Sequence, residues 1–349
     1  MSRENAHRNT NFDLTGLETF WKVLETFEGG SKPSRSDWRR LFSTPGYKAL
    51  FQNDPFFRAP YLKKMFTLAY DPSKAKERGT CAENERDQYL LSHYMHVKER
   101  KDEIRSLVEG LFDRDVNGEA RKAAFRYLPL RKVSNLDDPP VSFIIFKSDA
   151  RGFSTRVVMD ALAGVEWDDP FLLLAHEYHH YYRRQICTWD RDKGVDEGDK
   201  QVEIVLESVE SEGIADLINR TPLFDKARPR SSRGERYIRL VEEAPQFIKA
   251  MDGILAVCST MPDARKDLAR GLLEILPDGG HQVGFFMARA IEKGLGRKSV
   301  VDCVGDPFRF FATYSKVVSN PGSTLPAFSE RTTSFVESLR GTFMLKSPD

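Results

Sequence analysis

The stretch LLLAHEYHHYYRR, residues 172–184, places three histidines and a glutamate directly behind a short apolar run. Histidine is scarce in this chain, with seven among 349 residues, so a cluster of three requires an explanation. Asp169 is typical of a helix N-cap and Pro170 of the first helical position. No Gly or Pro interrupts residues 171–186. The pattern therefore predicts one helix that begins at residue 170 and carries the histidines.

His176 and His180 are four residues apart, so they project from one face of this helix, one turn from each other. Two imidazoles in this relation can bind one zinc ion, which prefers nitrogen, sulfur and carboxylate ligands. Glu177 lies about 100° further round the helix axis, where it is a poor ligand but can reach a water molecule. This is the HExxH pattern, whose glutamate is the general base of metallopeptidases. For the pentapeptide alone, a helix whose histidines only pack or face solvent remains the alternative.

A second helix, predicted over residues 201–220, offers candidates for the third protein ligand that a zinc site needs. It contains EGIAD, in which Glu212 and Asp216 are four apart and share one helical face. We expect Glu212 to bind the metal and Asp216 to accept the outer N–H of a liganding histidine. Gly213 costs about 1 kcal/mol in a helix interior, and we expect it to let this helix approach the histidine helix closely. The same helix offers competitors for the ligand role, interpreted mostly as solvent-facing charges, with Glu210 kept open as a ligand: Glu203, Glu207 and Glu210.

HEYHH and EGIAD, in this order, resemble the gluzincin clan of zinc metallopeptidases, and more narrowly a bacterial family of predicted zinc-dependent proteases. The resemblance is specific over residues 141–220 and weaker over residues 270–292. It implies a zincin-like catalytic core that hydrolyses peptide bonds with one Zn²⁺ ion. It also implies that residues 141–146, or a neighbouring strand, form the edge strand that pairs with an extended peptide or protein substrate.

Residue by residue, the resemblance implies that His176, His180 and Glu212 bind the zinc ion. Glu177 is then the general base, and Asp216 supports a liganding histidine.

Residues 277–292, PDGGHQVGFFMARAIE, begin with a Gly-rich turn and continue as a predicted helix. His281, where the helix starts, is a candidate donor to the oxyanion of a tetrahedral intermediate. Proteins of the similar family tend to have a tyrosine at this position, and either side chain can donate a hydrogen bond. The alternative is a histidine at a helix start with no catalytic part.

The rest of the chain predicts a fold dominated by helices. Apolar spacing predicts helices over residues 14–27, 34–51 and 83–113. Residues 141–146 and 154–160 are short and rich in β-branched or apolar side chains, so we expect two strands that form a hairpin. The predicted class is α+β, predominantly helical, with a zincin-like core and a small antiparallel sheet. The expected division is an N-terminal helical region, 1–136, and a catalytic region, 137–349, packed as one unit.

Composition excludes several classes of function. The formal net charge is +1, from 53 basic and 52 acidic residues, which predicts no nucleic-acid or membrane partner. The N-terminal residues contain no apolar signal sequence, and no apolar run is long enough to span a bilayer. The four cysteines are dispersed, as in a protein with reduced thiols. We therefore expect a cytoplasmic protein.

Two rival functions remain open. The same zinc site could hydrolyse a non-peptide amide or act on a single protein partner. Alternatively, the chain could be a non-catalytic helical binding or regulatory protein that retains a structural zinc site. Glu177 argues against the second rival, because a structural site needs no base.

Overall fold

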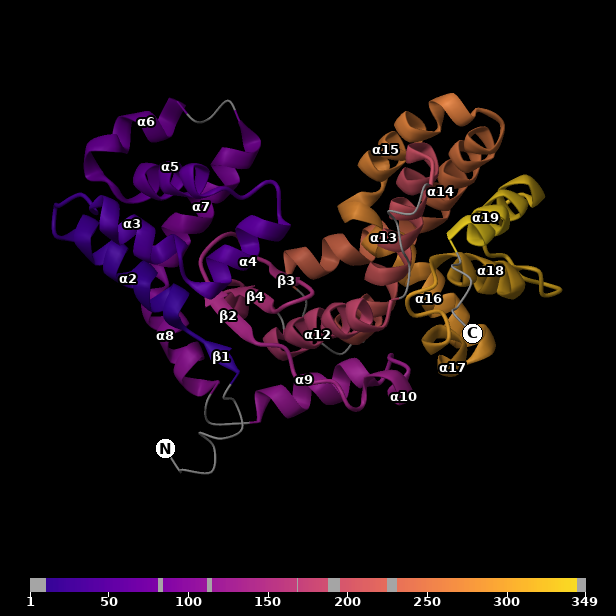
Figure 1. The fold of residues 1–349 in the computed structure, drawn as a ribbon, viewed down its shortest axis with the longest axis horizontal. Coiled ribbons are helices and arrows are strands. Elements are labelled where there is room, and N and C mark those ends of the chain that lie inside the picture. The colour runs from indigo at the N-terminus through magenta and orange to yellow at the C-terminus, as the bar shows by residue number, and fades with distance from the viewer. Residues whose placement is uncertain are drawn as a thin grey trace. The chain divides into compact units, whose positions relative to one another are not determined.

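The computed structural model describes residues 11–80, 84–111, 115–167, 169–187, 195–224 and 231–343. These residues are predominantly helical and include one small sheet, which confirms the predicted α+β class. The chain divides into two compact units, and most of their helices and strands are labelled in Figure 1. Unit 1 comprises Met1–Lys122 and Leu136–Tyr181, and unit 2 comprises Ala123–Asn135 and Tyr182–Asp349. The division into residues 1–136 and 137–349 stays a prediction, because compactness alone does not identify a segment that folds by itself.

Unit 1 combines a bundle of short helices with the sheet. Its elements are β1 (Phe12–Asp13), α2 (Thr15–Glu28), α3 (Arg35–Phe42), α4 (Pro45–Asn53), α5 (Ala59–Tyr70), η1 (Pro72–Lys74), α6 (Ala75–Thr80), α7 (Glu85–Glu99), α8 (Lys101–Gly110), most of α9 (Val116–Phe125), β2 (Val141–Ile144), β3 (Ala150–Gly152), β4 (Val157–Asp160), α11 (Ala163–Glu166) and most of α12 (Pro170–Ile186).

The helix predictions for this unit are right in type and partly wrong in extent. Helix α2 confirms the prediction for residues 14–27. Residues 34–51 form two helices, because Pro45 starts α4 and holds Thr44 in an extended conformation, with φ −67° and ψ 152°. The helix expected over residues 83–113 also divides, at Arg100, and the redirected α8 packs against α11.

The sheet is mixed, with strand order β1-β2-β4-β3. The expected hairpin between residues 141–146 and 154–160 is wrong, because β2 and β4 pair in parallel, with Val141 opposite Val157. The antiparallel partner of β4 is β3, which forms from the turn-like residues 150–152. Both β2 and β4 are buried at every position, the pattern of parallel strands that are covered on both faces.

Buried hydrogen bonds tie the helices of unit 1 to the ends of its strands. Tyr47 of α4 donates to the carbonyl oxygen of Ile145 at 2.7 Å. Asp160, at the end of β4, accepts from the backbone N–H of Phe146 at 2.7 Å, and its Oδ2 lies 3.1 Å from Nε2 of His93. His93 is therefore a core histidine.

Unit 2 is built around one long helix, α13. Its elements are the end of α9, α10 (Leu130–Val133), the end of α12, α13 (Glu197–Asn219), η3 (Thr221–Phe224), α14 (Ser232–Thr260), η4 (Pro262–Ala264), α15 (Arg265–Ile275), η5 (Pro277–Gly280), α16 (His281–Leu295), α17 (Arg297–Val301), α18 (Pro307–Val318) and α19 (Glu330–Phe343). Helix α13 packs against α15, α16 and α18. Within the described ranges, no helix has the length and apolar composition needed to cross a bilayer.

The closest helix approach in unit 2 explains Gly213. A Cβ atom on Gly213 would overlap the backbone of Gly284 in α16, and one on Gly284 would overlap the carbonyl oxygen of Val209. The sequence correctly predicts that Gly213 serves close packing, but its partner in this unit is α16 rather than the histidine helix. The contact places the start of α16, and therefore His281, beside the acidic residues of α13.

Candidate metal centre

The helix that carries HExxH begins and runs as the sequence predicts. Asp169 accepts from the backbone N–H groups of Phe171 and Leu172, both at 3.0 Å, and caps α12. Helix α12 belongs to unit 1 up to Tyr181 and continues without interruption into unit 2.

His176 and His180 face each other on this helix. Both side chains are buried, and their Nε2 atoms lie 2.9 Å apart. Two nitrogens bound to one tetrahedral zinc ion lie about 3.3 Å apart, so a small rotation of either ring suits a shared ion. Glu177 is also buried, with Oε1 4.0 Å from Nε2 of His176. The arrangement combines two nitrogen ligands with a carboxylate that can act on water beside them.

An edge of the sheet lies against the same helix. A Cβ atom on Gly152, the last residue of β3, would lie 2.5 Å from the carbonyl oxygen of Glu177 and 3.0 Å from Cβ of His180. Residues 141–146 and 154–160 supply interior strands, so neither can be the substrate-pairing edge strand that the resemblance implies. The edge strand beside the motif is β3, whose sequence, ARG, carries no strand signal.

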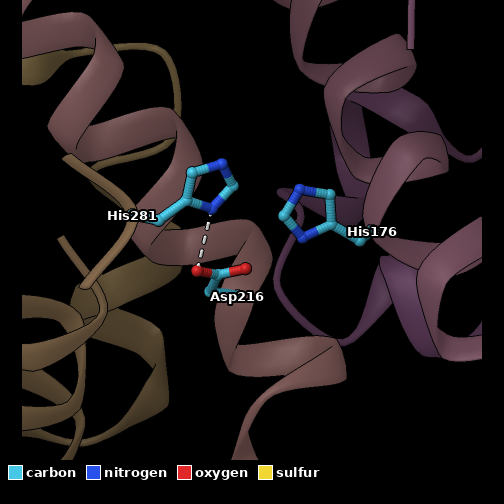
Figure 2. Close-up of side chains that lie close together, drawn as sticks. All are labelled: His176, Asp216 and His281. Atoms are coloured by element: carbon cyan, nitrogen blue, oxygen red, sulfur yellow. Dashed lines mark hydrogen bonds and ion pairs between the residues drawn. The ribbon is translucent and has the colours of Figure 1, made fainter. Parts of the chain in front are cut away.

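Unit 2 holds Glu212, Asp216 and His281 in one cluster. Nε2 of His281 lies 3.2 Å from Oε2 of Glu212, and its Nδ1 lies 3.0 Å from Oδ2 of Asp216. Figure 2 shows the contact between His281 and Asp216 as a dashed line. The Tyr237 hydroxyl donates to the same Asp216 oxygen at 2.7 Å. His281 and Tyr237 thus both contact Oδ2 of Asp216, and Nε of Arg220 lies 3.8 Å from its Oδ1.

Backbone geometry places His281 at this position. The turn η5 passes through Asp278 and Gly279 with φ values of 46° and 72°, and α16 starts directly after it. Ser208 of α13 donates to the carbonyl oxygen of Gly279 at 2.6 Å. The turn is thereby attached to α13, one helical turn before Glu212.

Sequence reasoning missed Tyr237, which comes from α14. Burial raises the pKa of the Tyr237 hydroxyl well above its usual value, and the negative charge of Asp216 adds to this effect. The hydroxyl therefore stays protonated and donates to Asp216. No local pattern around Tyr237 could indicate this role, because the contact depends on how α14 packs.

The acidic competitors on α13 differ from the expectation. Glu203 and Glu210 are fully buried, so the interpretation of both as solvent-facing is wrong. Glu210 forms a buried ion pair with Arg183 of α12, whose Nε donates to Oε2 of Glu210 at 3.0 Å. Nη1 of Arg183 also donates to Oε1 of the half-buried Glu207 at 2.8 Å. Glu210 is buried because the core contains a cation that it neutralises.

Comparison with known proteins agrees with this chemistry. A family model described as "Putative zinc dependent peptidase (DUF5700)" matches residues 38–321, a span that includes both motif helices. No curated protein and no solved structure matches the chain. The matched span covers well over half of the 349 residues, and the chain therefore belongs to the DUF5700 family, whose description is that of a zinc-dependent peptidase.

Proposed function

We propose that this protein is a zinc-dependent peptidase of the gluzincin type, in which His176, His180 and Glu212 hold one zinc ion. The main support is the buried pair of imidazoles on α12, with Nε2 atoms 2.9 Å apart and Glu177 beside them. Two nitrogens and one carboxylate oxygen form a donor set that catalytic zinc sites use. The family description supports the same chemistry independently.

Two sets of ligands can be drawn from the described residues. One is His176, His180 and Glu212, and the other is His176, Asp216 and His281. Asp216 already accepts from Tyr237 and contacts Nδ1 of His281, and both contacts compete with metal binding by its Oδ2. The second set does not include His180, so it leaves the close approach of the His176 and His180 rings unexplained. We therefore favour the first set.

In the proposed mechanism, different residues of the chain carry out different steps of peptide hydrolysis. When bound, zinc supplies a Lewis acid that makes water nucleophilic near neutral pH. Glu177 takes the proton of the attacking water as general base and passes it to the leaving amine. Nδ1 of His281 contacts Asp216, and its Nε2 can donate to the developing oxyanion. Asp216 and Tyr237 hold the ring in this orientation.

The substrate in this proposal is a peptide or protein in the cytoplasm. An extended backbone could pair with β3, the edge strand that ends at Gly152 next to Glu177 and His180. The dispersed cysteines favour a reducing compartment. The rival reading, a zinc amidohydrolase with a non-peptide or single-partner substrate, uses the same residues, and a broad peptide library separates the two. Cleavage of many unrelated sequences supports the general peptidase, whereas cleavage of none supports the rival.

The ligand set is tested by measuring the zinc content of the purified protein beside His176→Ala and Glu212→Ala. Both variants are expected to lose most of the metal. His96→Ala is a matched control, because His96 lies on the exposed face of α7. Equal zinc in the protein and both ligand variants would exclude this ligand set.

The role of the base is tested by Glu177→Gln, which keeps the size of the side chain but removes its basicity. This variant is expected to retain zinc and to lose turnover by about 10²- to 10⁴-fold, the usual contribution of a general base. Turnover close to that of the unaltered protein would remove Glu177 from the mechanism.

A further inference from the structure

We infer that Arg183 is a positioning residue, which fixes how the histidine helix α12 meets the acidic helix α13 and so sets the geometry of the proposed zinc ligands. This inference rests on the proposed function. Arg183 is one of the largest fully buried side chains, and its guanidinium binds Glu210 and Glu207 of α13. All these contacts lie within unit 2.

The position of Arg183 in the sequence connects it with the metal site. Residues 176, 180 and 183 follow the i, i+4, i+7 spacing of one helical face, so Arg183 continues the line of the two histidines. It lies one turn beyond His180, a rise of about 4.5 Å along α12. Its partner Glu210 lies two residues before Glu212, about 3 Å along α13. A rotation or shift of either helix at this contact would move the proposed ligands with it.

The geometry of the contact is directional. Nε and Nη2 of Arg183 both donate to Glu210, and Nη1 donates to Glu207, so three groups of one planar guanidinium are engaged. Glu210 is held from its other side by the backbone N–H of Gly305, which donates to Oε1 at 3.0 Å. The planar guanidinium, with its donors in fixed positions, therefore defines the orientation of both partners. A lysine ammonium on a flexible chain would not define it.

Stability alone does not account for this ion pair. Removing two charges from water carries a large desolvation cost, and well-packed apolar residues often stabilise a protein as well as or better than a buried pair. The presence of this ion pair next to both motifs is explained if it holds α12 and α13 in a defined orientation. A displacement of about 1 Å among catalytic groups can lower a rate by about 100-fold.

The test uses the double variant Arg183→Met/Glu210→Gln, which removes both charges and leaves an acceptor for the Gly305 N–H. Zinc affinity is measured by competition with a chromophoric chelator, the coordination by the visible spectrum of the cobalt-substituted protein, and folding by the thermal midpoint. We expect the double variant to have a thermal midpoint within a few degrees of that of the unaltered protein. Its zinc binding should be at least tenfold weaker and its cobalt spectrum altered. Its kcat should fall by more than any change in KM. Arg184→Met is the matched control, because Arg184 is the adjacent, exposed arginine.

Each outcome decides between the two proposals. If the double variant folds and keeps the zinc affinity, cobalt spectrum and kcat of the unaltered protein, Arg183 has no positioning role and the zinc proposal stands. If the unaltered protein itself binds no zinc, the proposed function fails first. If the double variant does not fold, Arg183→Lys tests the inference, because it keeps the positive charge but lacks the planar guanidinium. Weakened zinc binding and an altered cobalt spectrum in a folded Arg183→Lys support the inference, and unchanged values overturn it.

Discussion

His281 contacts two carboxylates of α13 at once, those of Glu212 and Asp216. The sequence predicts that Asp216 orients a histidine that binds zinc. Within unit 2, Asp216 contacts His281 and receives a hydrogen bond from Tyr237, and its support of a zinc-binding histidine stays a prediction. At the scale of single residues, contacts thus run from Tyr237 through Asp216 to His281, and they orient the His281 ring at the proposed site of catalysis.

Asp216→Asn tests this role. We expect kcat to fall about 10- to 100-fold, because an amide orients the His281 ring less well than a carboxylate does. Zinc affinity is expected to change less than twofold. Both are measured on the same preparation, with Asp263→Asn as a control at an exposed acid. The opposite result, weaker zinc binding with unchanged kcat, would return Asp216 to the role predicted from the sequence.

Asp149, directly before β3, gives a prediction for pH. Burial opposes its ionisation, but the cations of Arg151 and Lys147 outweigh burial and lower the pKa of Asp149 from 3.8 to about 2. A carboxyl group whose pKa is lower in the folded state stabilises the fold above its unfolded pKa, and this stabilisation is lost as the pH falls from about 4 to 2. Asp149→Asn should therefore cost at most about 2 kcal/mol at pH 7 and almost nothing at pH 2. Urea denaturation at both pH values measures the difference, and a constant difference would contradict the account.

At the scale of elements, the approach of α13 and α16 depends on two glycines and cannot be relaxed locally. The atoms that an added Cβ would meet are backbone atoms of the partner helix, which cannot rotate away. The same approach determines how near His281 lies to Glu212. Packing between these helices is therefore coupled to the proposed chemistry.

Gly213→Ala is expected to destabilise the protein by about 1–3 kcal/mol, the usual cost of overpacking, despite the better helix propensity of alanine. Gly253→Ala is the matched control: Gly253 also lies inside a helix, but no atom lies within 4 Å of an added Cβ. The control should stabilise the protein by about 0.5–1 kcal/mol. Chemical denaturation measures both, and a stabilising effect of Gly213→Ala would disprove the close contact.

At the scale of the whole molecule, the proposed ligands come from both units. His176 and His180 belong to unit 1, and Glu212 belongs to unit 2. A metal that binds only the folded chain stabilises it by mass action. Zinc would then link the stability of the two units.

Zinc at about 100 times its dissociation constant should stabilise the folded protein by about 2.7 kcal/mol, and a chelator should reverse the effect. Thermal unfolding followed with and without zinc measures this shift. Glu212→Ala should unfold at the same temperature in both conditions. A full shift in that variant would place the metal elsewhere.

Local patterns predicted the parts of this protein that depend on neighbouring residues. Asp169 and Pro170 define the start of α12, and the spacing of His176 and His180 is enough to bring their nitrogens together. The helical class and most helix positions follow in the same way. The helix that divides at Arg100 shows the limit, because no proline or glycine marks that break and α8 packs against α11 after it.

The sequence by itself therefore determined the helical class and the HExxH helix, and it proposed the candidate ligands, since these follow from residue spacing within single helices. Only the tertiary structure decided that the sheet is mixed, that Gly213 packs on α16, and that Asp216 contacts His281 and Tyr237. It also decided that Arg183 and Glu210 form a buried pair. These contacts join residues from separate elements, and their formation depends on the burial of surfaces that no local pattern contains.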